Sequence, residues 1–183
     1  MPAGYCLTTL LLSKCIRPEN HRMNRRYLLT GLGASLLPDL DLIYFYLIDH
    51  RQHPHHTYIS HIPFYWILGA LCVVLCCALR RHRCIMWSTI IIISNVLLHL
   101  MLDSLASKVL WFYPISDSGV GLFHVPSQHE WWVWNYLFHW TFGFEILIVV
   151  AAGCLLYYKR NQEASCRTQK EKHYAGNRFN CGG

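Results

Sequence analysis

Long apolar runs separated by short polar segments dominate this chain. Residues 61–79, 85–102 and 132–158 form three such runs and carry almost no charge. Each run is about 18 residues or longer, so a helix with a rise of about 1.5 Å per residue can cross the roughly 30 Å hydrocarbon core of a bilayer. The pattern therefore predicts three transmembrane helices.

A fourth run, residues 27–48, is equally long but contains Pro38, Asp39 and Asp41. Carboxylates inside a membrane are costly, so they are expected to face a polar interior and to be functional. Residues 5–13 are apolar but too short to span, and we interpret them as an interfacial or re-entrant helix or as the remnant of a longer one. The predicted fold is an all-α, polytopic transmembrane bundle of about four spans with a short N-terminal apolar segment.

The composition agrees with a membrane protein. Hydrophobic residues make up 54% of the chain and charged residues only 14%, against roughly 25% charged residues in soluble domains. The net charge of +6 comes from short clusters between the apolar runs, which indicates membrane topology and argues against a nucleic-acid partner. The nine Cys include no C-x-x-C pair, so neither a disulfide framework nor a zinc–thiolate site is predicted.

The basic clusters precede the first predicted span, separate the second from the third and follow the fourth, so four spans place all of them on one side. The positive-inside rule makes that side cytoplasmic and the protein a multi-pass protein of the inner membrane. Residues 1–160 are expected to form the membrane-embedded domain. Residues 161–183 are polar and lack apolar periodicity, which predicts a disordered cytoplasmic tail.

Histidines gather on the opposite side of the predicted membrane. Nine of the 12 His fall in the outer loops or at outer ends of spans: His50, His53, His55, His56, His61, His99, His124, His129 and His139. Imidazole is the commonest side-chain metal ligand. The distribution predicts a metal site at this face, with His124, His129 and His139 as additional ligands or acid–base groups.

Two further pairs contain acids. Asp39 and Asp41 are two residues apart and can face one site only if Pro38 breaks or bends the helix. A pair of acids in a loop or at the start of a helix is the alternative. His99 and Asp103 are separated by one helical turn and share a face. They can chelate one ion, or Asp103 can orient His99, or both can be packing residues.

His56 and His61 are five residues apart at the start of an apolar run. This spacing suits a turn followed by a helix, with both imidazoles converging, although interfacial His among aromatic residues is the alternative. Glu145, a lone acid in the last run, is expected to point into the bundle. The combined ligand set is Asp39, Asp41, His56, His61, His99 and Asp103.

The order P-D-L-D, H-x4-H and H-x3-D on a small multi-span protein resembles the bacterial YdjM-type family of inner-membrane, predicted metal-dependent hydrolases. The resemblance covers most of the chain from about residue 1 to residue 158. The stretches PDLDLIYFYLIDHRQHPHH and HLMLDSL carry it. It implies metal-dependent hydrolysis at the membrane.

These observations lead to the hypothesis of a hydrolase with a divalent metal, Zn²⁺ before Mn²⁺ or Fe²⁺. The metal would activate a water for attack on an ester, most plausibly a phosphoester of a lipid or envelope substrate. Asp41 would be a further ligand or the catalytic general base. The membrane lipid is the expected partner, since a site at the outer face meets lipid head groups.

The alternative is a non-enzymatic divalent-metal-binding membrane protein, such as a transporter, a sensor or an assembly factor. A transporter needs polar groups along a full path, yet residues 64–79 and 85–94 contain no acidic, basic or His residue. That absence argues against transport. Bis-His haem binding is a third possibility, for which His99 and His61 or His139 are the candidate ligands.

Overall fold

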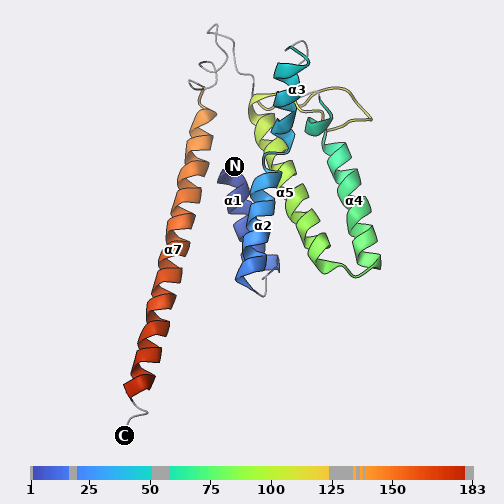
Figure 1. Cartoon of the computed structure of the whole chain (residues 1–183). Helices are drawn as coiled ribbons and strands as arrows, with labels where there is room; N and C mark the ends of the chain where they lie inside the picture. The colour runs from blue at the N-terminus through green and yellow to red at the C-terminus, as the bar shows by residue number, and fades with distance from the viewer. Residues whose placement is uncertain are drawn as a thin grey trace.

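The structure is a computed structural model that describes residues 2–16, 20–50, 58–123, 134, 137 and 139–179; in the last segment, side chains are described to residue 165 except that of residue 163. Six helices form most of it (Figure 1): α1 (Pro2–Leu11), α2 (His21–Ala34), α3 (Asp41–Leu47), α4 (Pro63–Leu79), α5 (Arg83–Ala106) and α7 (Phe142–Phe179). Three short helical turns join them: η1 (Leu12–Ile16), η2 (Pro38–Leu40) and η4 (Ile59–His61). Across these residues the β-structure is limited to one bridge between Val109 and Val120. The predicted all-α class is confirmed.

The number of spans is smaller than predicted. Helix α5 and the Phe142–Gln162 part of α7 are long and apolar enough to cross a membrane. Helix α2 and the Pro38–Leu47 segment count as a third span if this bent pair is one span. Helix α4 is apolar but has only 17 residues, because the run predicted from His61 becomes α-helical only at Pro63, a residue favoured at the first helical position. The structure supports two or three spans, where about four were predicted.

The break between α2 and α3 follows from Pro38. Proline has no backbone N–H, and its ring clashes with the preceding helical turn. Residues 35–37 form a turn, in which the Leu37 amide donates to the Ala34 carbonyl at 3.2 Å, and Pro38 opens η2. The two helical segments meet at a bend of 50°. The predicted bend is therefore confirmed.

Helix α1 packs inside the bundle. It contacts α2, α5 and α7, and Figure 1 shows its N-terminal end about half-way along the neighbouring helices. Its 10 residues are too few to cross a bilayer, as predicted.

Two glycines bring α1, α2 and α5 together. A Cβ atom added to Gly4 would overlap the Ser35 hydroxyl, and one added to Gly31 would overlap Thr8. Buried Asn95 of α5 occupies the space between these helices and donates from Nδ2 to Thr8 Oγ1 at 2.9 Å. Small residues at such contacts let helices approach closely, and side-chain hydrogen bonds then link them inside the membrane.

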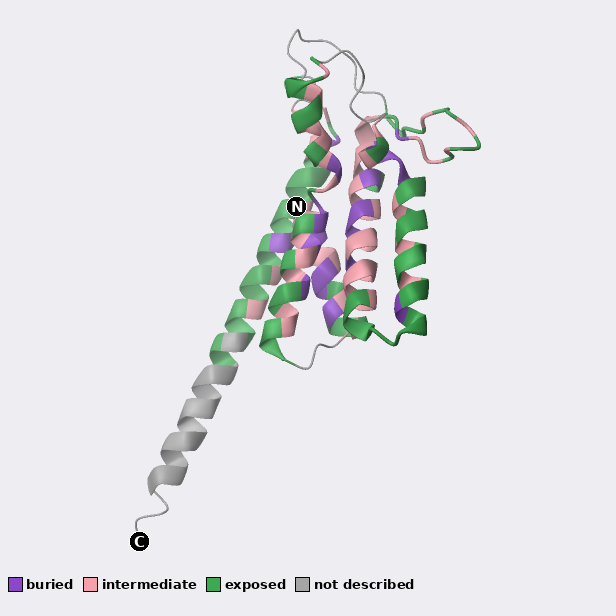
Figure 2. Cartoon of the chain, turned by 45° about the vertical axis from the view of Figure 1, so that its right-hand side comes forward, coloured by how far each residue is buried: buried purple, intermediate pink, exposed green. Residues whose placement is uncertain are grey.

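Helix α7 lies along the outside of the bundle. Figure 2 shows it exposed over most of its described length, whereas buried residues concentrate in the helices around α5. The helix continues to Phe179, so residues 161–179, expected to be disordered, are helical. Gln, Glu, Lys and Arg are good helix formers, and the apolar part of α7 supplies the nucleus from which the helix extends. The division into two domains at residue 160 stays a prediction.

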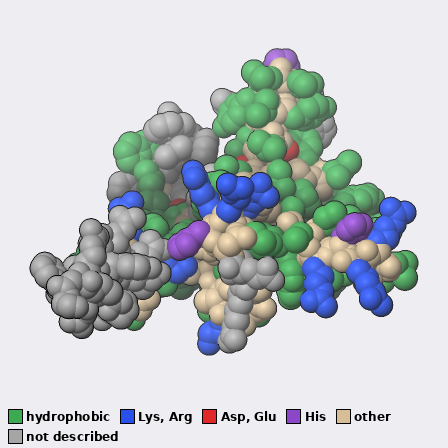
Figure 3. Space-filling view, turned by 60° about the horizontal axis from the view of Figure 1, so that its bottom comes forward, with side chains coloured by type: hydrophobic (Ala, Val, Ile, Leu, Met, Phe, Trp, Pro, Cys, Tyr) green, Lys and Arg blue, Asp and Glu red, His purple; other side chains and the backbone are tan. Residues whose placement is uncertain are grey.

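Basic side chains collect at one end of the bundle. Helix α2 begins there, and α4 and α5 are joined there through Arg80 and Arg81 (Figure 1). Figure 3, which brings this end forward, shows the Lys and Arg side chains on it. The arrangement separates a basic end from the end at which α3 and η4 lie.

The close approach at Gly31 can be tested by adding one methyl group. Gly31→Ala should lower the free energy of unfolding by about 1–3 kcal/mol, because the new Cβ overlaps Thr8 in a packed contact. Gly33→Ala is the matched control on the same helix, since no atom lies within 4 Å of its added Cβ. Thermal unfolding in detergent would measure both. Equal stability of the two variants would contradict the packing described here.

Candidate metal centre

Four segments bring acids and imidazoles to the end of the bundle opposite the basic end. Asp39 lies in η2, Asp41 begins α3 and His61 ends η4. His99 lies 16 residues after the start of α5, which places it about 24 Å from the basic end. The bend before Pro38 and the short turn before α4 direct these side chains to one place.

Asp39, His61 and His99 form the core of the cluster. One ligand atom from each residue lies within 4.8 Å of the others. The His61 side chain is fully buried, whereas that of Asp39 is 41% exposed. The cluster is therefore closed on the His61 side and accessible on the Asp39 side.

Asp103 completes the cluster from α5. Its Oδ2 atom lies 3.1 Å from His99 Nε2 and 3.6 Å from His61 Nε2, and His99 Nε2 lies 3.3 Å from Asp39 Oδ1. Asp103 Oδ2 and His99 Nε2 are buried and make no hydrogen bond, although they are close enough for one. These distances allow one ion to contact ligand atoms from all of these residues.

Each imidazole is held through its other ring nitrogen. His99 Nδ1 lies 2.9 Å from the Ser35 carbonyl oxygen, which can only accept, so Nδ1 carries a proton. His61 Nδ1 lies 2.6 Å from Asp41 Oδ2, an acceptor that holds this ring in the same way. In the neutral imidazoles that bind a metal, the two Nε2 atoms would then supply the lone pairs that face the cluster.

Asp41 stands behind His61 and not in the core of the cluster. Its Oδ2 atom also accepts a hydrogen bond from the Ser60 hydroxyl, and the Ser60 carbonyl accepts one from Trp66 Nε1 at 2.8 Å. This chain connects His61 to the first turns of α4. The geometry gives Asp41 the position of a group that orients a ligand.

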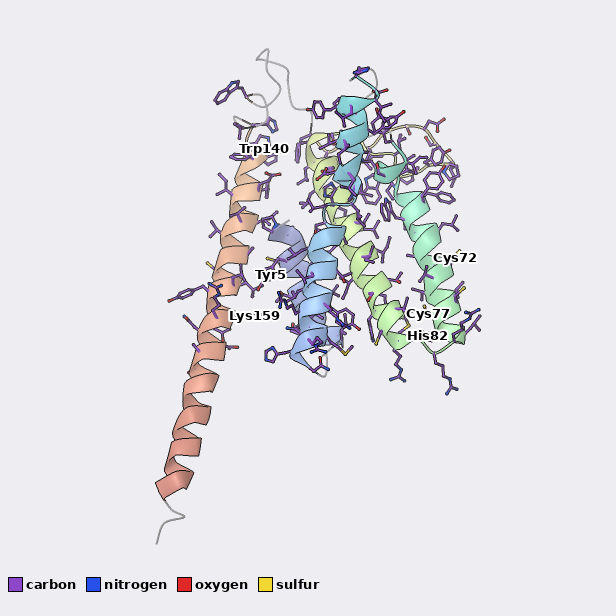
Figure 4. All side chains as sticks on the ribbon, in the orientation of Figure 1. Tyr5, Cys72, Cys77, His82, Trp140 and Lys159 are labelled. Carbon is purple, nitrogen blue, oxygen red and sulfur yellow. The ribbon has the colours of Figure 1, made fainter. Side chains whose placement is uncertain are left out.

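The donor set fits a divalent transition metal. Two imidazole nitrogens and two carboxylate oxygens suit Zn²⁺, Mn²⁺ or Fe²⁺. Within the described residues, the group with metal-ligand spacing contains no Cys, and Cys72 and Cys77 lie along α4 toward the basic end (Figure 4). The metal and its identity stay predictions.

Some predicted residues lie elsewhere or outside the described residues. His56 belongs to the latter group, together with His53, His55, His124 and His129. His139 lies near the start of α7, where its Nδ1 is 2.9 Å from Thr141 Oγ1. Glu145 is exposed, although it also lines a small cavity beside α5; its predicted position inside the bundle is borne out only in part.

Sequence reasoning missed the Ser35 carbonyl and Ser60, which bond to residues of the centre, and Tyr58, which directly precedes η4. The Ser35 carbonyl leaves no signal in the sequence, because any residue could supply it. Ser60 directly precedes His61, and that adjacency was the available signal. Tyr58 contacts Tyr44 edge to face, with ring centroids 5.5 Å apart, and burial, with the Asp49 carboxylate beside it, raises the pKa of Tyr58 to about 12. Its phenol therefore stays neutral at physiological pH.

Comparisons with known proteins place the chain in a family. The family model described as YdjM inner membrane protein matches residues 2–168. No curated protein and no solved structure matches. Since the matched segment covers nearly the whole chain and includes every residue of the candidate centre, this protein belongs to the YdjM inner membrane protein family.

Proposed function

We propose that the chain is a membrane-bound metal-dependent hydrolase acting on an ester or phosphoester of a lipid or envelope substrate. The observation that carries the proposal is the convergence of Asp39, His61 and His99 within 4.8 Å. Asp103 Oδ2 and His99 Nε2 add to it, because they are buried 3.1 Å apart without a hydrogen bond. Burying such groups is costly unless a cation balances them.

The residues of the centre have two roles, as metal ligands and as positioning groups. Asp39, His61, His99 and Asp103 hold the metal, and His56 remains a predicted fifth ligand. Asp41 and the Ser35 carbonyl are positioning groups, since each fixes the tautomer of one imidazole. A bound Zn²⁺ would lower the pKa of water to about 7 and stabilise charge that develops on the substrate. The role of Asp41 as general base stays a prediction.

The location of the centre supports an ester of the membrane or envelope. The centre lies at the end of the bundle away from the Lys and Arg side chains (Figure 3), which the positive-inside rule places in the cytoplasm. In this orientation Asp39, the partly exposed residue of the centre, faces the outer leaflet. Lipid head groups are the esters and phosphoesters available there.

Metal content is the first test. Detergent-purified wild type should retain about one or two divalent ions per chain, and the His99→Ala/Asp103→Ala variant should lose them because two donors are gone. Elemental analysis measures both, with membrane insertion and elution volume as controls for folding. Asp103→Asn should likewise abolish hydrolysis of a phosphoester found by screening. No metal in wild type, even after metal is added back, would remove the case for a hydrolase.

A conservative substitution tests whether Asp41 orients His61 or binds the metal itself. Asp41→Asn should weaken metal binding about 10–100-fold, the usual effect of losing a carboxylate that orients a ligating His. Asp117→Asn removes an exposed acid outside the cluster and should bind normally. Competition with a chromophoric chelator would measure the affinities. Complete loss of metal would make Asp41 a ligand, and unchanged affinity would leave it without a role.

The proposed orientation predicts which introduced cysteines a reagent outside the cell can label. In a variant whose own cysteines are replaced by Ser, Ser118→Cys should react with a membrane-impermeant maleimide in intact cells. Arg81→Cys, at the basic end, should react only after permeabilisation, because that end is proposed to be cytoplasmic. Both positions are exposed. The reverse pattern would invert the topology and place the centre beneath the inner leaflet.

A further inference from the structure

An apolar cavity of about 490 Å³ lies between α1, α5 and α7. Its walls are aliphatic except for Cys6 and Thr9 of α1 and Ser13 of η1. In Figure 4, Tyr5 marks α1 beside α7, and Trp140 and Lys159 mark the two ends of the apolar part of α7. The volume is within the range of roughly 300–1,000 Å³ of small-molecule sites.

One end of this cavity adjoins the candidate metal centre. Ala3, Leu98 and Leu102 line it, and the same three residues line a smaller cavity that reaches Ser35 and His99. Leu102 also directly precedes Asp103. A molecule in the apolar cavity would thus have one end beside the ligands of the centre.

The cavity is elongated along the bundle. Its lining extends over Ala3 to Ser13 on α1 and η1 and over Leu147 to Leu155 on α7, which corresponds to about 15 Å and about 12 Å of helix. Both helices run toward the basic end, α7 from the end near α3 and α1 from about half-way along the bundle (Figure 1). The long axis therefore points from the centre into the hydrocarbon core, which is the direction of a lipid chain below its head group.

The walls of the cavity favour a hydrocarbon chain as the occupant, because nine of the 12 lining residues are aliphatic. Walls without charged side chains also exclude a polar peptide as the occupant.

We infer that the apolar cavity between α1, α5 and α7, called the groove from here on, binds one acyl chain of a membrane phospholipid. It would thereby bring the ester and phosphoester groups of that lipid to the candidate centre. The inference rests on the proposed function for the role of the centre, and it narrows the substrate class to acylated phospholipids. Binding of the acyl chain depends on the apolar walls of the groove and needs no metal. The two ideas can therefore fail separately.

The test uses a phosphatidylcholine that carries a photoreactive diazirine in one acyl chain. Full-length protein in nanodiscs, stripped of metal by a chelator, is illuminated, and the labelled peptides are identified by mass spectrometry. Label should concentrate on the groove residues of α1 and α7. Ala151→Trp should reduce this label at least about tenfold, because the indole fills the space of the chain.

Val150→Trp is the matched control, since Val150 is 57% exposed on the same helix and does not line the groove. Its groove label should equal that of wild type. Label spread evenly over α4 and α7, or an equal loss in both Trp variants, would overturn the inference. Groove label from a polyprenyl phosphate probe but not from the acyl probe would overturn the acyl assignment, and cross-links between two chains would make the face an interface.

Two readouts separate this inference from the proposed function. The His99→Ala/Asp103→Ala variant should keep the groove label while losing metal, since its changes lie outside the acyl walls. Ala151→Trp should keep its metal while losing the label. Groove label in a wild-type protein that binds no metal would support the lipid site and remove the hydrolase. Bound metal without groove label would support the metal centre and remove the lipid site.

Discussion

A break in a membrane-embedded helix leaves backbone groups that need new partners, and the arrangement of this bundle follows from how that need is met. In a continuous helix, the Ser35 carbonyl would accept from the amide of Asp39, four residues later. Here the chain turns over residues 35–37, and the Ser35 carbonyl accepts from His99 Nδ1 at 2.9 Å. One hydrogen bond thus satisfies a backbone group, joins α2 to α5 and fixes which nitrogen of His99 faces the carboxylates.

The supports around this bond belong to the packing of the helices. The Ser35 hydroxyl is 3.4 Å from Asn95 Oδ1, and Asn95 also bonds to Thr8 and to the Ile91 carbonyl. Gly4 leaves room for the Ser35–Asn95 contact, which a Cβ would overlap. Inside a membrane, apolar side chains gain little from leaving lipid, so small residues and such hydrogen bonds hold helices together. The network that joins α1, α2 and α5 therefore also determines where His99 stands.

The elements whose cause is local were predictable from the sequence. Pro38 predicted the bend, and the one-turn spacing of His99 and Asp103 predicted that they share a face; both are confirmed. The length of α4 was overestimated, because a hydropathy run does not show that Pro63, and not His61, begins the α-helix. The support of His99 by Ser35 was not predictable, since a backbone carbonyl carries no residue signal and the contact joins positions 64 residues apart. Long-range contacts of the backbone need the fold to be known.

The candidate centre and the apolar groove impose opposite demands on any molecule that contacts both. The centre presents imidazoles and carboxylates, with Asp39 partly exposed, and it favours a polar, oxygen-rich partner that water can reach. The groove presents aliphatic walls and would exclude such a group. Only an amphipathic molecule satisfies both sites at once, with its polar part at Asp39 and His99 and its hydrocarbon part along α1 and α7. A bilayer supplies such molecules already aligned, because its lipids keep the polar head at the interface and the chain parallel to the helices.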